Sequence, residues 1–163
     1  QRGTPYRGVL YAGLMIQDAQ PYTLEFNCRF GDPETQVLMP LLQNDLLELA
    51  YGVARGALKA TELAFERRAA VCVVLASGGY PGEYRTGLPI EGLDAAANLP
   101  NTLIFHAGTR AENGQILTHG GRVLNIVGLG DTLEEARQNA YRAAEQIHFD
   151  GMHYRRDIAE SVL

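Results

Sequence analysis

Residues 25–30 alternate polar and apolar side chains without interruption, and this alternation constrains the local fold more than any other feature of the chain. Successive side chains of a β-strand point to opposite faces. A strand here places Glu25, Asn27 and Arg29 on one face and the apolar side chains between them on the other. The sequence therefore predicts one face that packs into a core and one face available for chemistry.

The polar face of this strand has the composition of an ion site. Side chains two residues apart on a strand lie about 6 to 7 Å apart, so the Glu25 carboxylate and the Asn27 amide oxygen can share one hard cation. Arg29 is one step further along, suitably placed for an anion. The alternative is a strand whose outer face is simply solvated, but Asn is depleted in strand interiors, which counts against that interpretation.

Several short blocks of the sequence occur together in one enzyme family. Residues 25–36 read Glu-Phe-Asn-Cys-Arg-Phe-Gly-Asp-Pro-Glu-Thr-Gln, and further blocks lie at 11–15, 76–87, 105–109 and 120–124. In this order the blocks resemble the glycinamide ribonucleotide synthetase family, also called phosphoribosylamine–glycine ligases, within the ATP-grasp ligases. The resemblance covers nearly the whole chain.

The resemblance implies an ATP-dependent carboxylate–amine ligase of purine biosynthesis. In this family ATP phosphorylates the glycine carboxylate, and the amine of 5-phosphoribosylamine then attacks the glycyl phosphate, which gives glycinamide ribonucleotide, ADP and phosphate. The expected cofactors are ATP and Mg²⁺ or Mn²⁺, with Glu25 and Asn27 as the metal ligands. The stretch 11–16 contains no carboxylate, so a third ligand is expected from elsewhere or from water.

The same resemblance suggests roles for the residues that follow the strand. Arg29 is expected to bind the ATP phosphates and steady the transferred phosphoryl group, because a guanidinium fork fits phosphate; the alternative is a salt bridge to Asp32 or Glu34. Glu34 is a candidate contact to the substrate amine. Asp32 is a candidate substrate contact, but its position before a proline favours a helix N-cap.

Two arginines in the second half are candidate phosphate ligands. The glycine-rich segment 78–82 lacks the Lys-Ser/Thr of a P-loop, and the resemblance makes it a loop that closes over the active site. Arg85 is then expected to meet a substrate phosphate. Arg122 is expected either to bind the phosphate of 5-phosphoribosylamine or to pair on the surface. His106, which follows an apolar strand, is interpreted as structural rather than as a general base.

The predicted fold class is α+β. Residues 1–66 are expected to form the C-terminal end of an ATP-grasp domain, an antiparallel sheet with helices. Residues 67–163 are expected to form a small β-rich, substrate-side domain with a terminal helix. The boundary, near 62–68, follows the change from helical to strand periodicity and has no Gly/Ser linker.

The periodicity also predicts the individual elements. Asp45 and Glu48 form a possible capping pair for a helix, and Thr132 with Glu135 forms a capping box. Asn113-Gly114 predicts a hairpin turn. Strands are expected near 8–16, 22–30, 71–76, 103–107, 115–118 and 122–128, and helices near 33–40, 45–57 and 132–147.

Composition limits the partners and the compartment. The net charge of −5 argues against nucleic acid, and no apolar stretch approaches the length of a membrane span. Cys28 and Cys72 are expected to be buried free thiols, which, with no visible signal peptide, predicts a cytoplasmic protein.

The chain opens on Gln1 rather than Met, so we expect a piece of a longer enzyme that needs its N-terminal portion for activity. Three alternatives stay open: another ATP-grasp ligase, a non-catalytic fragment that only folds or binds a partner, and a regulatory nucleotide-binding domain. Retention of Glu25, Asn27 and Arg29 together argues against lost chemistry.

Overall fold

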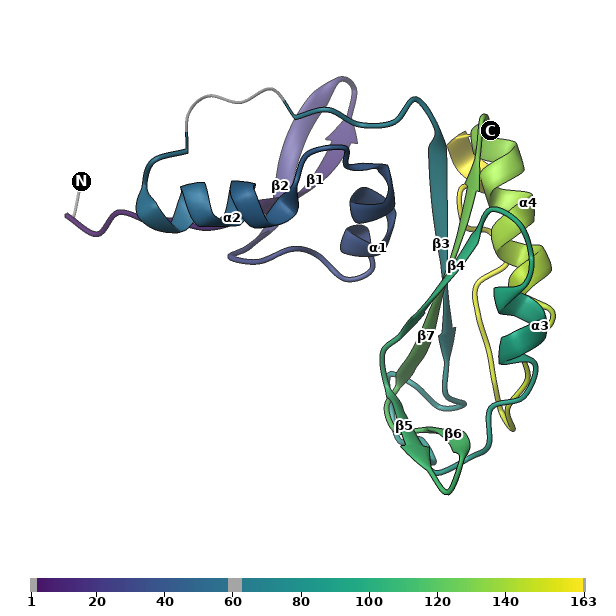
Figure 1. The fold of residues 1–163 in the computed structure, drawn as a ribbon. Coiled ribbons are helices and arrows are strands. Elements are labelled where there is room, and N and C mark those ends of the chain that lie inside the picture. Colours follow the sequence, from purple (N-terminus) through teal and green to yellow (C-terminus); the bar gives the residue numbers. More distant parts are fainter. Residues whose placement is uncertain (1–2, 59–62, 163) are drawn as a thin grey trace. The chain divides into compact units, whose positions relative to one another are not determined.

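The computed structural model describes residues 3–58 and 63–162, and the chain divides into two compact units. The first unit contains Gln1–Thr35 and Leu42–Glu66, and the second contains Gln36–Leu41 and Arg67–Leu163. The architecture is α+β, as predicted, with antiparallel sheets and few helices (Figure 1). Glu62, at the start of the predicted boundary segment, lies outside the described residues.

The first unit begins with an antiparallel hairpin of β1 (Tyr11–Gln17) and β2 (Gln20–Asn27). The turn residues Asp18 and Ala19 have φ of 50° and 60°, which matches the two-residue turns that suit twisted strands. The two strands predicted near 8–16 and 22–30 are therefore both present, joined as a hairpin. Both strands are shorter than predicted, and β2 ends at Asn27.

One extra residue interrupts the pairing of the hairpin. Gly13 pairs with Glu25, whereas Leu14 pairs with Thr23, so Leu24 has no opposite residue and forms a β-bulge. The bulge shifts the register of everything beyond it by one position. It therefore decides which β1 residues lie opposite the polar end of β2.

The predicted core face of β2 is wrong for this chain. Phe26 is 62% exposed and Cys28 is also exposed. The hairpin is a sheet of two strands within the described residues, and two strands cannot bury their own faces. Apolar side chains consequently stay exposed along both strands: Leu14, Met15, Ile16, Tyr22, Leu24 and Phe26.

Short helices follow the hairpin. As predicted, a helix comes after the Gly-Asp-Pro turn: α1 (Glu34–Leu38) continues as the 3-10 helix η1 (Met39–Leu41). The next helix, α2 (Leu46–Arg55), is capped as predicted by Asp45, whose carboxylate accepts hydrogen bonds from two first-turn amides at 2.8 and 3.1 Å. Gly56, in the left-handed conformation, ends it.

A three-stranded antiparallel sheet forms the centre of the second unit. Its strands are β3 (Ala69–Ala76), β4 (Thr102–His106) and β7 (Arg122–Gly130), in the order β3-β7-β4. Helix α4 (Leu133–Ala144) packs along β7 and β3, and the short α3 (Leu93–Ala97), where no helix was predicted, packs beside it on β4 (Figure 1).

A second hairpin extends this unit. It joins β5 (Thr109–Glu112) and β6 (Gln115–Thr118) through Asn113-Gly114, whose φ values are 49° and 79°. The predicted turn is confirmed. The strand that pairs with β6 is β5, which was not predicted as separate from the strand at 103–107.

Close backbone approach fixes α4 on the sheet. The hydroxyl of Thr132 accepts a hydrogen bond from the Glu135 amide at 3.1 Å, so the predicted cap is present. A Cβ at Gly128 would lie 2.1 Å from the Ala136 carbonyl oxygen, so only glycine permits this distance. The core that results contains Val71, Val73, Leu75, Leu124, Ile126, Ala140, Ile147 and Phe149.

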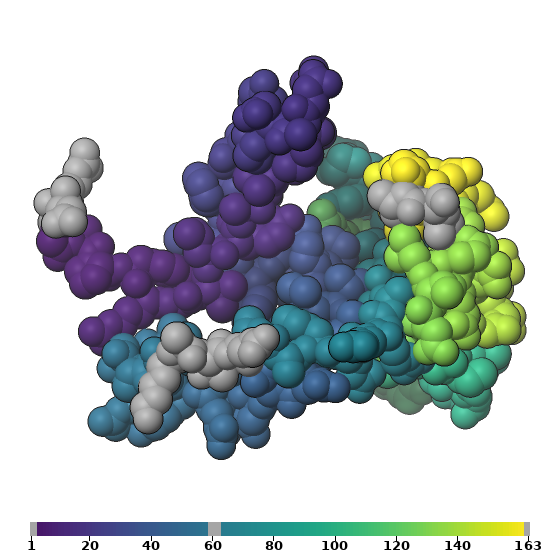
Figure 2. All heavy atoms as spheres, turned by 90° about the horizontal axis from the view of Figure 1, so that it is seen from above, coloured from purple at the N-terminus to yellow at the C-terminus, as the bar shows by residue number. Residues whose placement is uncertain are grey.

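The end of the chain returns along α4 (Figure 2), with His153 forming a β-bridge to Ala76. It ends in the 3-10 helix η2 (Glu160–Val162). Cys72 is half-buried rather than buried, and both cysteines are free. Within the described residues, no helix has the length and apolarity to cross a membrane.

We expect Gly128→Ala to lower the free energy of unfolding by about 1 to 3 kcal/mol, because the added methyl group must push α4 away from β7. Urea denaturation followed by circular dichroism measures this loss. Gly114→Asn is the control, since Gly114 has open space around it and Asn tolerates its positive φ. Equal stability of Gly128→Ala and the parent chain would contradict the packing described.

Candidate active site

Glu25 and Asn27 form a connected polar pair at the end of β2. The Asn27 side-chain amide donates a hydrogen bond to Glu25 Oε1 at 3.0 Å. Glu25 is exposed and Asn27 half-buried, so both remain accessible. The structure thus confirms that these two side chains share one face of the strand.

Glycine on the opposite strand keeps this face open. Gly13 pairs with Glu25, and a Cβ at Gly13 would lie 3.0 Å from the Glu25 side chain. A side chain at this position would crowd the carboxylate. The glycine therefore leaves space beside Glu25 for a ligand.

Tyr11 connects this pair to helix α1. It pairs with Asn27 across the hairpin, and its hydroxyl donates a hydrogen bond to Glu34 Oε1 at 3.0 Å. This bond to the carboxylate, the charge of Glu34, partial desolvation and, more weakly, the charge of Glu25 raise the pKa of Tyr11 above its ordinary value. Glu34, a predicted site residue, is thereby held at the polar end of the hairpin.

Arg29 does not lie on the polar face of β2, where strand alternation predicted it. Because β2 ends at Asn27, Arg29 lies in the bend that follows, and its guanidinium donates to the Phe30 carbonyl at 3.1 Å. Asp32 is in the next turn, two residues before α1 begins at Glu34. The capping role of Asp32 stays a prediction.

In the second unit, the glycine-rich loop is fixed to the start of β7. The Ser77 hydroxyl donates to the Gly120 carbonyl at 2.8 Å, and Arg122 Nε donates to the Tyr80 hydroxyl at 3.1 Å. Gly121 lies so close to the Tyr80 ring that a Cβ would overlap it. The blocks at 76–87 and 120–124 thus meet in space.

The two remaining candidates of this unit, Arg85 and His106, each contact a nearby side chain. Arg85 lies 3.3 Å from Asp150, and both side chains are largely exposed, so the pair itself is weak and the arginine is accessible. His106 Nδ1 lies 2.9 Å from the Thr109 hydroxyl, in accord with the structural role predicted for it.

Two tyrosines, Tyr11 in the first unit and Tyr80 in the second, were assigned no role from the sequence. Tyr11 stands in one of the resembling blocks, but the two-residue turn alone would pair it with Phe26. The bulge moves it opposite Asn27. Tyr80 was predicted only as part of the glycine-rich loop 78–82, and its contact with Arg122 depends on a strand about 40 residues away along the chain.

The donor set suits a hard divalent cation. Carboxylate and amide oxygens are preferred ligands of Mg²⁺, which commonly takes one or two protein ligands and completes its shell with phosphate and water. Across residues 3–58 and 63–162, no three His, Cys, Asp or Glu side chains converge on one metal position. Glu25 and Asn27 carry side-chain oxygens of the kind that such an ion prefers.

The sequence matches two family models: "Phosphoribosylglycinamide synthetase, C domain" over residues 70–161 and "Phosphoribosylglycinamide synthetase, ATP-grasp (A) domain" over residues 1–35. It is 51% identical to the phosphoribosylamine–glycine ligase of Caldanaerobacter subterraneus subsp. tengcongensis, with 98% of this chain and 37% of that protein covered. Identity to the Synechocystis sp. ligase is 50%, with 100% of this chain and 39% of that protein covered.

A solved structure agrees with these relatives. The crystal structure of phosphoribosylamine–glycine ligase from Thermotoga maritima matches with a TM-score of 0.81 and 44% identity, over 96% of this chain and 38% of that one. The chain thus spans well under half the length of these curated relatives, 37% of the first and 39% of the second. On the combined match of sequence and fold, the chain belongs to the phosphoribosylglycinamide synthetase family.

Proposed function

We propose that this chain is part of an ATP-dependent ligase that joins glycine to 5-phosphoribosylamine through glycyl phosphate, giving glycinamide ribonucleotide, ADP and phosphate. The observation that carries the proposal is the hydrogen-bonded pair of Glu25 and Asn27 beside Gly13, in a chain of this family. The pair presents hard oxygen ligands on a face that the glycine keeps open.

Glu25 and Asn27 would hold Mg²⁺ or Mn²⁺ in this proposal. When bound, the ion would supply positive charge that offsets the negative charge developing during phosphoryl transfer. Tyr11 acts as a positioning residue, because its hydrogen bond fixes the Glu34 carboxylate next to the pair. Glu34 is proposed to contact the substrate amine.

The other candidates serve as anion or substrate contacts. Arg29, exposed beyond β2, is proposed to bind the ATP phosphates through its guanidinium fork. Asp32 is proposed as a substrate contact in the turn before α1. Arg85 and Arg122 are proposed to bind the phosphate of 5-phosphoribosylamine, with Tyr80 orienting Arg122 through their hydrogen bond.

We assign residues 1–66 to the C-terminal part of the ATP-grasp domain and residues 67–163 to the substrate-side domain. The matches to the A-domain and C-domain models over residues 1–35 and 70–161 support this division. The two free cysteines support a reducing, cytoplasmic location.

The rest of the ligase is the proposed partner of the β1–β2 hairpin. Apolar side chains are exposed on both of its strands, with Ile16 61% exposed and Leu24 65% exposed. Several exposed apolar side chains on one short hairpin are typical of an interface. The relatives supply a candidate occupant, since this chain spans only 37% of the length of the first of them.

We expect Glu25→Ala and Asn27→Ala each to lower glycine-dependent ADP release by more than about 100-fold, because loss of even an outer-sphere partner of a metal site costs about 10- to 100-fold. The assay uses the chain assembled with the N-terminal portion of the ligase, at saturating ATP and Mg²⁺.

Glu48→Ala is the matched control, since Glu48 is an exposed carboxylate on α2 and is expected to leave the rate unchanged. Full activity of Glu25→Ala would contradict the metal assignment. No ADP release by the parent assembly with any amino acid or amine would instead favour a non-catalytic fragment.

We expect Tyr11→Phe to lower kcat/KM by about tenfold, because it removes the donor that fixes Glu34 while keeping the ring. Tyr22→Phe, at an exposed tyrosine of the same hairpin, is the control.

Because the pKa of Tyr11 is raised, its hydroxyl keeps its proton until the pH exceeds the ordinary tyrosine value of about 10. The rate of the parent enzyme should therefore show no titration of Tyr11 between neutral pH and that value. Unchanged kcat/KM in Tyr11→Phe would contradict its positioning role.

A further inference from the structure

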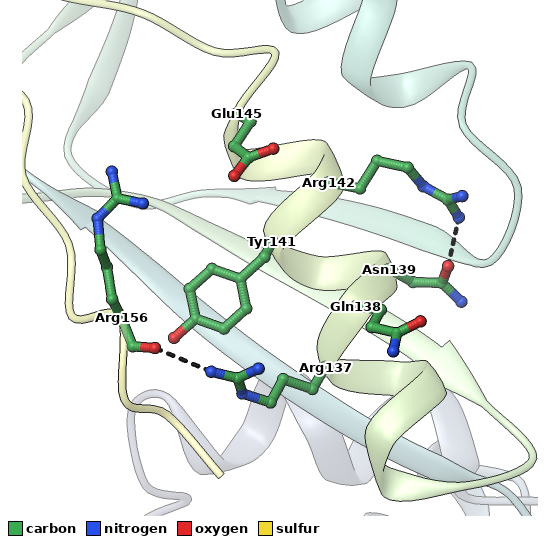
Figure 3. Close-up of a pocket in the computed structure, with 7 residues that line it drawn as sticks. All are labelled: Arg137, Gln138, Asn139, Tyr141, Arg142, Glu145 and Arg156. Atoms are coloured by element: carbon green, nitrogen blue, oxygen red, sulfur yellow. Dashed lines mark hydrogen bonds between the residues drawn. The ribbon is translucent and has the colours of Figure 1, made fainter. Parts of the chain in front are cut away.

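The outer surface of α4 carries a groove that the proposed reaction does not use. It has a volume of about 540 Å³ and is bordered by α4 and by the returning C-terminal segment (Figure 3). Arg137, Arg142 and Arg156 line it, together with Tyr141 and a single carboxylate, Glu145. The groove is thus a basic surface on a chain whose net charge is −5.

The groove arginines differ from four other arginines of this unit in what they contact. Those four have carboxylate partners, whereas the three in the groove bond to neutral groups or stack on rings. Within the described part of the chain, no carboxylate forms an ion pair with the groove arginines. The four paired arginines are Arg68 with Asp131, Arg85 with Asp150, Arg110 with Glu112, and Arg155 with Asp157.

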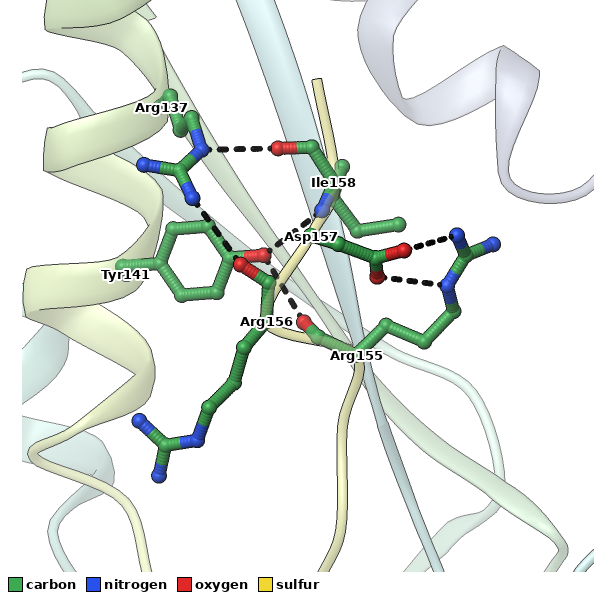
Figure 4. Close-up of polar contacts among 6 residues, drawn as sticks. All are labelled: Arg137, Tyr141, Arg155, Arg156, Asp157 and Ile158. Carbon is green, nitrogen blue, oxygen red and sulfur yellow. Dashed lines mark hydrogen bonds and ion pairs between the residues drawn. The ribbon is translucent and has the colours of Figure 1, made fainter. Parts of the chain in front are cut away.

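Arg137 and Tyr141 hold one wall of the groove in place (Figure 4). Arg137 donates to the carbonyls of Ile158 and Arg156 at 2.9 and 3.0 Å, and its guanidinium lies over the Tyr141 ring at 4.9 Å. The Tyr141 hydroxyl donates to the Arg155 carbonyl at 2.9 Å. Side chains fixed in this way lose little conformational entropy when a partner binds to them.

The other two arginines are also oriented. Arg142 donates to the side-chain oxygen of Asn139, which is itself 5% exposed and bonded to the Leu129 carbonyl at 2.7 Å. The Arg156 guanidinium lies over the Tyr154 ring at 5.3 Å. Both arginine side chains remain exposed, so their charges are available to a partner.

From this geometry we propose that the α4 groove binds an acidic segment of a partner protein. Clusters of arginine are a recurring means of recognising acidic or phosphorylated motifs, because each guanidinium can bond a carboxylate in two places. The open, polar surface differs from the enclosed, mainly apolar pockets that take small molecules. A nucleic acid would need a longer basic stripe and would be repelled by the net charge of −5.

Fluorescence anisotropy with a labelled peptide of alternating Glu and Ser tests the proposal. The folded chain should bind the peptide, and Arg142→Gln/Arg156→Gln should weaken binding by about tenfold or more. Arg137 stays unchanged because it holds the C-terminal segment. The control Arg67→Gln/Arg110→Gln removes the same charge elsewhere in the second unit and should change the affinity less than about twofold.

Three results would overturn the proposal. The parent chain could fail to bind the peptide, or the control could lose as much affinity as the groove variant. As the third such result, ATP or a labelled oligothymidine could bind the groove and exclude the peptide. The groove would then be a site for a small anion or for nucleic acid. Circular dichroism of each variant confirms that the chain is folded.

Discussion

The register of the β1–β2 hairpin is the constraint on which the candidate active site depends. Leu24 has no opposite residue, and this one bulge places Gly13 opposite Glu25 and Tyr11 opposite Asn27. Without it, the β1 residues beyond the bulge would shift by one position against β2, and a one-residue shift exchanges the two faces of the pairing. The open space at Glu25 and the Tyr11 link to Glu34 both follow from this register. A single backbone irregularity thus assembles residues from two strands and a helix.

The second unit uses close backbone contacts in a comparable way. Gly78 approaches Gly151, and Gly108 approaches Gly120, at distances where a Cβ would overlap backbone atoms. In the antiparallel order β3-β7-β4, the end of β3, the start of β7 and the end of β4 lie at the same end of the sheet. The glycine-rich loop and Arg122 are joined there. Because loops at strand ends can vary while the sheet stays fixed, this end is well suited to substrate contacts.

Local patterns in the sequence were sufficient for much of this fold. Alternation predicted β2, Asn113-Gly114 predicted the β5–β6 turn, and Thr132 and Asp45 predicted helix caps, because each signal acts within a few residues. Long-range features were not predictable in this way. The bulge at Leu24 has no local signature, and the exposure of Phe26 depends on how many strands join the sheet. For the site, Glu25 and Asn27 followed from alternation, whereas Tyr11 required the true register.

The proposed function depends most on Glu25 and Asn27 together binding the divalent cation of the ligase. Electron paramagnetic resonance of Mn²⁺, titrated into the assembled enzyme with ADP present, measures this binding without requiring turnover. We predict that the parent enzyme binds Mn²⁺ and that Glu25→Ala/Asn27→Ala loses most of this affinity while its circular dichroism spectrum is unchanged. Equal Mn²⁺ affinity and stoichiometry in the two proteins would contradict this assignment.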